Sequence, residues 1–433
     1  MQQILTYFFL VVYSVTILGI ILVIITENRN PLKTLPWIVV LVLAPVVGLV
    51  FYFFFGQNLS KQRIISRRTR KRITMQLEEA EHTDGPDLPE AYRPLAALLT
   101  NTSHSIPLYG SRITTYTDGR SKMEALLTEI ACAKHHIHIQ YYILNDDETG
   151  RRLRDALIAK AREGVEVRIL YDDVGSSGAK KSFFRSMRSE GIEVYAFLHV
   201  KFPLFTSKVN YRNHRKIVVI DGRIGFIGGM NIADRYVRGT QWGTWRDTHF
   251  RIEGSGAAGL QASFLSDWSA TTKTHISGPE YYPPVGHFTD DILQIAPSGP
   301  FGKWRALLQA DSYAIARARQ RIWIQTPYYL PSEVLNTALQ EAALAGIDVH
   351  LMLPARSDSK VVDLATHSYL DDMMKAGVKI SFYKPGFLHS KLLIIDDMLS
   401  VIGSANMDFR SFEHNFEVNA FVYDREFTAR MAG

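Results

Sequence analysis

The sequence has one cysteine, Cys132, among its 433 residues. A single thiol can form neither an internal disulfide nor a thiolate metal cage, because each requires at least two cysteines. Five histidines show no recognised metal-ligand spacing: His104, His135, His136, His138 and His199. We therefore expect no metal and no cofactor, and we expect Cys132 to be a buried, small apolar residue on a helix.

Charged side chains are absent from two long stretches near the amino terminus, 1–26 and 34–60. Their apolar parts run from 4 to 25 and from 35 to 55, and about 20 apolar residues suffice to cross a bilayer. Pro45 should kink the second helix within the membrane. A cleaved signal peptide is the alternative for the first stretch, but a basic start and a small-residue cleavage site are missing. We predict two transmembrane helices.

Basic residues follow directly after the second stretch: Lys61, Arg63, Arg67, Arg68, Arg70, Lys71 and Arg72. By the positive-inside rule this cluster is cytoplasmic, so both termini and all downstream sequence should face the cytosol. The cluster could also bind anionic lipid, or it could be only a topology signal or a solvated face. The sequence leaves these alternatives open.

The rest of the chain has the pattern of an α/β protein. Polar, acidic and proline-containing sequence from 76 to 94 predicts a linker. Beyond it, "HHIHIQYYIL" (135–144) predicts a buried strand, 149–163 an amphipathic helix, and "VEVRILY" (165–171) the next strand. The chain is 46% hydrophobic and can bury a large core, and its net charge of +6 does not by itself indicate nucleic acid binding.

The same order of segments occurs twice. "RIWIQTPYYL" (321–330) resembles the first strand, "AGIDVHLMLP" (345–354) resembles 163–172, and "MMKAGVKISFY" (373–383) resembles 187–197. Three matches in one order at a spacing of roughly 185 residues indicate a duplication. We predict a two-helix membrane anchor (1–60), a basic juxtamembrane segment and linker (61–105), a first half (106–275) and a second half (276–433).

Each half contains one copy of the pattern H-x-K-x4-D, followed by a glycine-rich turn and an asparagine. The first copy is His214, Lys216, Asp221 and Asn231, and the second is His389, Lys391, Asp396 and Asn406. Residues two apart on a strand face the same side, so each histidine should stand beside its lysine. Both aspartates stand where a tight hairpin turn is expected, which favours turn formation, or pairing with a neighbouring base, over contact with a substrate.

The doubled motif resembles the HKD signature of the phospholipase D superfamily, and the resemblance covers about residues 106 to 424. "RNPLKTLPWIVVLVLAPVVGLVFYFFFG" (29–56) and the following "GQN" look like the amino-terminal region of bacterial cardiolipin synthases in particular. This resemblance implies two homologous α/β/α sandwich halves related by pseudo-twofold symmetry. It also implies a catalytic set of His214, Lys216, Asp221, His389, Lys391 and Asp396.

The chemistry explains why two copies are needed. Covalent cleavage of a phosphodiester needs one neutral imidazole as nucleophile and a protonated one as acid for the leaving group. Lys216 and Lys391 would neutralise the phosphate oxygens, and Asn231 and Asn406 could add hydrogen bonds. The resemblance further implies that an acidic residue downstream of each motif orients a histidine, and Asp247 and Glu417 are the candidates.

By the usual family assignment His214 is the nucleophile and His389 the acid, although the sequence symmetry does not distinguish them. The implied activity is phosphatidyl transfer between two phosphatidylglycerol molecules to give cardiolipin and glycerol, in a multi-pass protein of the bacterial inner membrane. The expected partners are the phospholipid substrate and the bilayer, without nucleic acid. The alternatives are a membrane-bound hydrolytic phospholipase D, a synthase that uses phosphatidylethanolamine as donor, and a superfamily nuclease.

Overall fold

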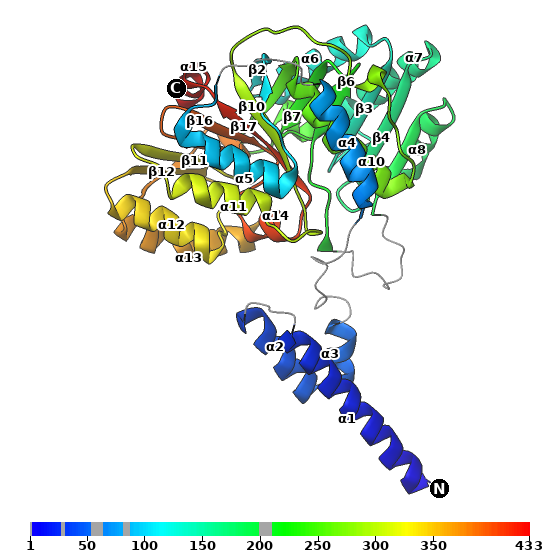
Figure 1. The fold of residues 1–433 in the computed structure, drawn as a ribbon, viewed down its shortest axis with the longest axis vertical. Helices are drawn as coiled ribbons and strands as arrows, with labels where there is room; N and C mark the ends of the chain where they lie inside the picture. Colours follow the sequence, from blue (N-terminus) through cyan, green and yellow to red (C-terminus); the bar gives the residue numbers. More distant parts are fainter. Residues whose placement is uncertain (1, 27–30, 53–63, 81–86, 199–209) are drawn as a thin grey trace. The chain divides into compact units, whose positions relative to one another are not determined.

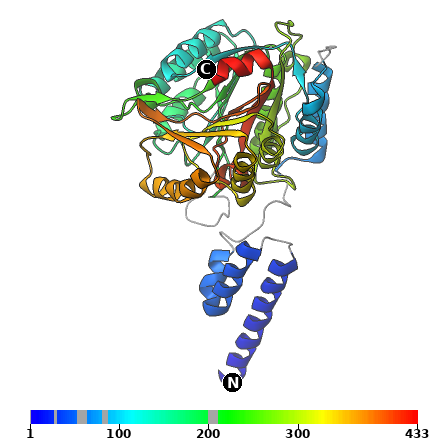
Figure 2. The same ribbon diagram turned by 90° about the vertical axis from the view of Figure 1, so that its left-hand side faces the viewer.

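The computed structural model describes residues 2–26, 31–52, 64–80, 87–198 and 210–433. These residues form two units, a helical unit that ends before residue 60 and a larger α/β unit. Each is described separately below (Figures 1 and 2).

The helical unit contains α1 (Gln2–Thr26), α2 (Pro31–Leu43) and α3 (Pro45–Phe51). Among the described residues, one helix is long and apolar enough to cross a membrane, over Gln2–Leu22. Ile17 of α1 and Leu41 of α2 are buried in one apolar cluster, so α1 and α2 pack together.

The second predicted transmembrane helix is interrupted. Ala44 has φ −137° and ψ 69°, outside the helical region, and Pro45 begins α3. Proline lacks an N–H and its ring clashes with the preceding turn, and here the helix breaks. Gly48 lets α3 approach α2 closely, since a Cβ there would lie 2.9 Å from the carbonyl oxygen of Val40. The prediction of two transmembrane helices is therefore not confirmed, and residues 53 to 55 lie outside the described residues.

The α/β unit contains two sheets with the same strand order. The first sheet runs β2-β9-β7-β6-β3-β4-β5 and the second β1-β10-β17-β16-β15-β11-β12-β13. The first is built from β2 (Arg112–Tyr116), β3 (His136–Tyr141), β4 (Glu166–Asp172), β5 (Glu193–Phe197), β6 (Ile217–Ile220), β7 (Ile224–Gly228) and β9 (His249–Glu253). The second is built from β1 (Leu108–Tyr109), β10 (Ile292–Ser298), β11 (Arg321–Gln325), β12 (Asp348–Pro354), β13 (Lys379–Tyr383), β15 (Leu392–Ile395), β16 (Leu399–Gly403) and β17 (Glu417–Tyr423).

The order β9-β7-β6-β3-β4-β5 matches β17-β16-β15-β11-β12-β13 strand for strand, which confirms the predicted duplication into two homologous halves. Three strands of each half are parallel, β3-β4-β5 in the first and β11-β12-β13 in the second, and the two motif strands form an antiparallel hairpin beside them. One strand departs from the predicted boundary, because β1 belongs to the first half in sequence but pairs with β10 in the second sheet.

Helices cover the outer faces of the two sheets (Figure 1). The first half has α6 (Gly119–Cys132), α7 (Glu148–Arg162) and α8 (Lys181–Arg188), and the second has α5 (Arg93–Ser103), α11 (Ala306–Ile315), α12 (Glu333–Leu344) and α13 (Lys360–Lys375). Between the sheets, α10 (Gly256–Thr272) and α15 (Arg425–Ala432, red in Figure 2) join one shared core that includes Trp268 and Phe427. The two halves are thus packed against each other.

Two expectations differ from the structure. Cys132 lies at the end of α6 as expected but is exposed, because it is on the outward side of the helix. The segment predicted as juxtamembrane sequence and linker contains α4 (Arg67–Ala80) and α5, both packed on the α/β unit. Ile73 and Leu77 bury one face of α4 against α10. Their spacing of four residues is typical of an amphipathic helix, but the many charged residues around them hide this pattern in the sequence.

Candidate active site

The two motifs enter the centre of the α/β unit on equivalent strands. His214 and Lys216 directly precede β6, and His389 and Lys391 directly precede β15. All four side chains are buried, with at most 9% of any residue exposed. Four apolar residues, "IVVI" in β6 and "LLII" in β15, follow each lysine and anchor it in the sheet.

Backbone hydrogen bonds tie each motif to the other half. The N–H of His214 donates to the carbonyl of Phe416 at 2.9 Å, and the N–H of His389 donates to the carbonyl of Arg246 at 2.7 Å. Near the second contact, β14 (Gly386–Leu388) pairs in parallel with β8 (Thr244–Arg246) across the two halves. Each histidine is therefore positioned by the segment that carries the other half's acidic residue.

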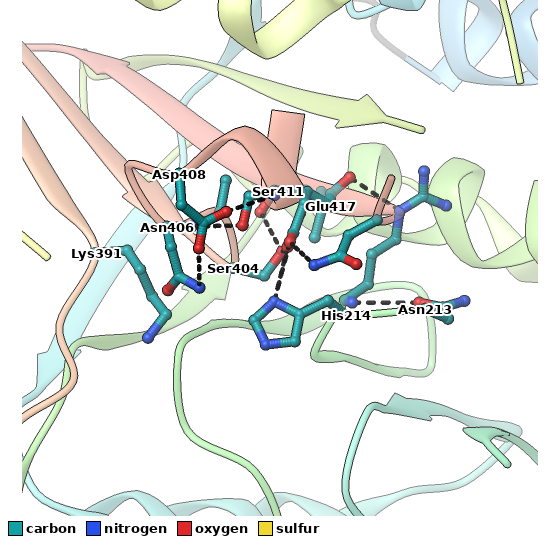
Figure 3. Close-up of polar contacts among 12 residues, drawn as sticks. Asn213, His214, Lys391, Ser404, Asn406, Asp408, Ser411 and Glu417 are labelled. Carbon is teal, nitrogen blue, oxygen red and sulfur yellow. Dashed lines mark hydrogen bonds and ion pairs between the residues drawn. The ribbon is translucent and has the colours of Figure 1, made fainter. Parts of the chain in front are cut away.

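The carboxylates are exchanged between the halves. Glu417 of the second half lies 3.0 Å from Nδ1 of His214, and Asp247 of the first half lies 2.6 Å from Nδ1 of His389 (Figure 3 shows Glu417 beside His214). With Nδ1 facing a carboxylate, the Nε2 atom of each imidazole remains for chemistry. Neither half forms a complete histidine-carboxylate pair alone.

Further contacts hold the two carboxylates in place. The hydroxyl of Ser404 donates to Glu417 at 2.5 Å, and the amide of Asn415 donates to it at 3.1 Å. Asp247 accepts the N–H of Thr248 at 2.8 Å. Burial alone would raise the pKa of Asp247, but Lys391 and His389 outweigh it and lower that pKa. Both acids are thus ionised and ready to orient an imidazole.

Burial lowers the pKa of each imidazole, so both histidines are neutral near pH 7. The pKa of His389 falls to about 3, with Lys391 adding to the effect and Asp247 opposing it. The pKa of His214 is lowered by burial and by both motif lysines, against the pull of Glu417. Each histidine feels the lysine of the other motif, so the two motifs share one electrostatic environment.

Burial also lowers the pKa of Lys216 to about 7 and that of Lys391 to about 8, and Lys391 repels Lys216. The ammonium of Lys216 donates to the carbonyl of its own His214 at 2.5 Å, and that of Lys391 contacts the carbonyl of His389. Because the ammonium groups of Lys216 and Lys391 are partly desolvated and repel each other, they favour the binding of an anion between them.

The two asparagines differ in their contacts. Asn231 accepts the N–H of Ile143 at 3.1 Å and donates to the hydroxyl of Tyr236 at 2.6 Å. Asn406 donates to Asp408 at 3.3 Å, while its buried Oδ1 has no hydrogen-bond partner among the described residues. The polar groups of Asn231 are therefore engaged by protein partners, and those of Asn406 only in part.

The structure places Asp221 and Asp396 at the hairpin turns beyond the motif strands. Asp221 accepts the backbone N–H groups of residues 134, 135 and 136, and Asp396 accepts those of residues 319, 320 and 321. Both have the left-handed backbone of a tight turn, with φ 52° and 54°. Their contacts pin the start of β3 and β11 to the motif hairpin.

Aromatic rings that the sequence reading did not single out surround the histidines. Tyr142 packs 4.9 Å from His214, and Trp245 and Tyr328 pack 5.0 Å and 6.5 Å from His389, measured between ring centroids. Each half has a pair of tyrosines at a similar place in the repeat, in "QYYIL" and in "QTPYYL". This repeated pair could have identified Tyr142 and Tyr328.

Lys122 was also missed. It is on α6, its exposed fraction is 0%, and its ammonium donates to the hydroxyl of buried Tyr141 at 2.8 Å. Burial lowers its pKa to about 7, while the charge of Asp247 opposes this shift. Lys122 thus lies within the field of Asp247, although no sequence motif includes it. In the described part of the chain, no group of His, Cys, Asp or Glu is arranged to hold a metal.

Comparisons with known proteins identify the family of this chain. The family model described as "Cardiolipin synthase, PLD-like domain" matches residues 126–258 and 313–433, and the model "Phospholipase_D-nuclease N-terminal" matches 14–57. Cardiolipin synthase 2 of Bacillus cereus is 42% identical over 93% of this chain and 80% of its own length. The major cardiolipin synthase ClsA of Bacillus subtilis is 39% identical over 95% and 88%.

A solved structure shows a similar fold. Phosphatidylserine synthase of Haemophilus influenzae superposes with a TM-score of 0.60 over 79% of this chain and 88% of its own, at 16% identity. This likeness bears on the fold alone.

Proposed function

Since the chain belongs to the family of PLD-like cardiolipin synthases, we propose that it performs its phosphatidyl transfer through a histidine-bound intermediate. Its activity is cardiolipin synthesis, and its substrate is a phospholipid. The observation that carries the mechanism is the exchange of carboxylates between the two motifs, which gives two oriented imidazoles in one buried site.

In the first step Nε2 of neutral His214 attacks the phosphorus of one phosphatidylglycerol. The bond from phosphorus to the headgroup oxygen breaks, and protonated His389 gives its proton to the departing glycerol. In the second step His389, now neutral, takes the proton from a headgroup hydroxyl of a second phosphatidylglycerol. That oxygen attacks phosphorus, the bond to His214 breaks, and cardiolipin is released.

His389 must gain a proton before it can act as an acid, because burial and the charge of Lys391 lower its pKa to about 3. Lys391 and Lys216 contribute to this low pKa, and an anionic phosphodiester between the lysines would offset their charge. Substrate binding therefore raises the pKa of His389 toward the working pH. In the same step the lysines neutralise the non-bridging oxygens, and Asn406 and Asn231 donate to them after Asn231 releases Tyr236.

The chain is associated with a membrane through its amino-terminal helical unit. We further propose the finer topology, in which α1 and the interrupted α2 and α3 both cross the bilayer and the α/β unit is cytosolic. The support is the apolar length of α1 and the basic residues at the start of α4, such as Arg67 and Arg68.

Product analysis tests the reaction. The full-length protein is incubated in vesicles with phosphatidylglycerol that is labelled in its headgroup glycerol. We expect labelled cardiolipin and free glycerol in equal amounts, without phosphatidic acid. Phosphatidic acid as the only lipid product would identify a hydrolase, and release of ethanolamine from added phosphatidylethanolamine would identify the other donor.

A further inference from the structure

Ile64 and Ile65 are the first described residues after the helical unit, and both pack on the α/β unit. Ile64 and Ile65 pack in one apolar cluster with Phe197, Ala270 and Phe416, together with Tyr211 and Phe301. Phe416 also accepts the backbone N–H of His214. Ile64 and Ile65 therefore belong to the same apolar cluster as the residue whose carbonyl positions the proposed nucleophile.

The same cluster continues to the surface through aromatic side chains. Phe301 packs on Phe416 and on Tyr211, with 5.7 Å between centroids in both pairs. His414 lies 6.1 Å from Tyr211 on one side and 6.1 Å from Phe409 on the other. Phe409 is 48% exposed, and Trp304, three residues after Phe301, is 46% exposed.

Cations border these aromatic rings. Lys303 lies 4.5 Å from the ring of Trp304. Arg67, Arg68 and Lys71 are exposed on the first turns of α4, directly after the two isoleucines. Because Ile73 and Leu77 fix α4 on α10, these cations are held rigidly on the α/β unit. Figure 1 shows the first turn of α4 and α14 (Phe409–Glu413) at the same end of that unit.

The covalent connection limits how far this surface can be from a bilayer. The apolar run of the anchor ends at Phe55, nine residues before Ile64. An extended chain covers at most about 3.6 Å per residue, so Ile64 stays within roughly 32 Å of the last anchor residue. Exposed aromatic and long basic side chains are the residues that fit the interface between headgroups and acyl chains.

We propose that the surface formed by Arg67, Arg68, Lys71, Lys303, Trp304 and Phe409 rests on a bilayer that contains anionic phospholipid. This basic-aromatic surface turns the side of the α/β unit next to His214 toward the lipid. A phospholipid could then bring its phosphate to the histidines while its acyl chains remain in the membrane. The inference rests on the proposed function, because it orients that same site.

Fluorescence of a reporter tests the contact. In the full-length Cys132→Ser protein, Trp304→Cys or its neighbour Lys303→Cys carries an environment-sensitive label, and Leu344→Cys is the matched control. Leu344 is 72% exposed at the end of α12, beside the start of β12. A label at 303 or 304 that is buried about 5–10 Å below the membrane surface should lose about half of its fluorescence to acyl-brominated lipids. The fluorescence of the label at 344 should not change.

Equal quenching at 304, 303 and 344 in protein that still makes cardiolipin would overturn the proposed orientation and leave the proposed function intact. Conversely, selective quenching in protein that yields phosphatidic acid would support the surface while rejecting the function.

Charge provides an independent arm. In vesicles with dilute phosphatidylglycerol at low salt, Arg68→Gln with Lys71→Gln should lose roughly fivefold in rate for each cation removed. The control is Lys134→Gln with Arg319→Gln, two exposed cations at the hairpin ends away from the histidines. Near 1 M salt the difference should shrink, because charges are screened within about 3 Å. Equal losses in both variants would contradict the proposal.

Discussion

Asp247, in the first half, lies 2.6 Å from Nδ1 of His389 in the second half. Glu417 and His214 repeat this contact in the opposite direction at 3.0 Å. The candidate active site is therefore complete only when both halves are folded and docked, and each motif contacts a residue about 140 to 200 positions away.

The first prediction concerns this exchanged pair. Asp247→Asn keeps the size of the side chain but removes the charge that orients and stabilises the imidazolium of His389. We expect the transfer rate to fall by roughly 10²- to 10⁴-fold, as when an orienting carboxylate is lost in other enzymes. Asp155→Asn, at an exposed carboxylate on α7, is the control. A rate near that of the wild type, measured in folded protein, would show that the carboxylate does not orient His389.

The second prediction separates the motif aspartates from the chemistry. Asp396→Asn weakens the acceptor of three backbone N–H groups, while asparagine tolerates the φ of 54°. We expect a loss of about 1–3 kcal/mol in the free energy of unfolding and an unchanged rate per folded molecule. Asp397→Asn, whose partner Arg321 is at the surface, should change stability by at most about 1 kcal/mol. A lost rate at full stability would instead place Asp396 in the chemistry.

The third prediction concerns Lys122. Lys122→Met removes a buried cation from the field of Asp247 and keeps the apolar stem. The carboxylate then acts more strongly on His389 and raises its pKa, so the alkaline limb of the pH-rate profile, where His389 loses the proton that it donates, should move up by roughly 0.5–1 unit. The control Lys160→Met removes a largely buried ammonium on α7 that pairs with Glu163. An unshifted profile in the Lys122 variant would leave this residue with a packing role only.

The fourth prediction is sensitivity to acid. Burial lowers the pKa of His136 to about 4, with the neighbouring His135 contributing, against 6.5 in an unfolded chain. Neutral His136 therefore makes its full contribution to the free energy of unfolding above pH 6.5. This contribution is lost as the pH falls toward 4. At pH 5 the loss is about 2 kcal/mol. Thermal unfolding of His136→Gln should show a shallower decline between pH 6.5 and 5, and an identical slope would contradict this.

Much of the fold could be predicted because its signals are local. The strands of the two halves are short apolar runs, and the doubled H-x-K-x4-D pattern fixes which side of each motif strand carries the histidine and lysine. The turns at Asp221 and Asp396 follow from their position after four apolar residues.

Contacts between distant segments could not be predicted in this way. The sequence symmetry allows Asp247 to serve either histidine, and only the docking of the two halves selects His389. Similarly, β1 is too short to show which sheet it joins, and Lys122 is surrounded by ordinary helix sequence. The break at Pro45 was expected as a kink, but the close return of α3 onto α2 depends on Gly48 and its neighbours in space.

The most direct measurement is to capture the intermediate. The full-length protein is mixed with short-chain phosphatidylglycerol, quenched in alkali within one turnover, digested and analysed by mass spectrometry. We predict one phosphatidyl group on the peptide that contains His214, absent from His214→Ala protein. An adduct on His389 would exchange the two proposed roles. Turnover without an adduct on either histidine would contradict the two-histidine mechanism.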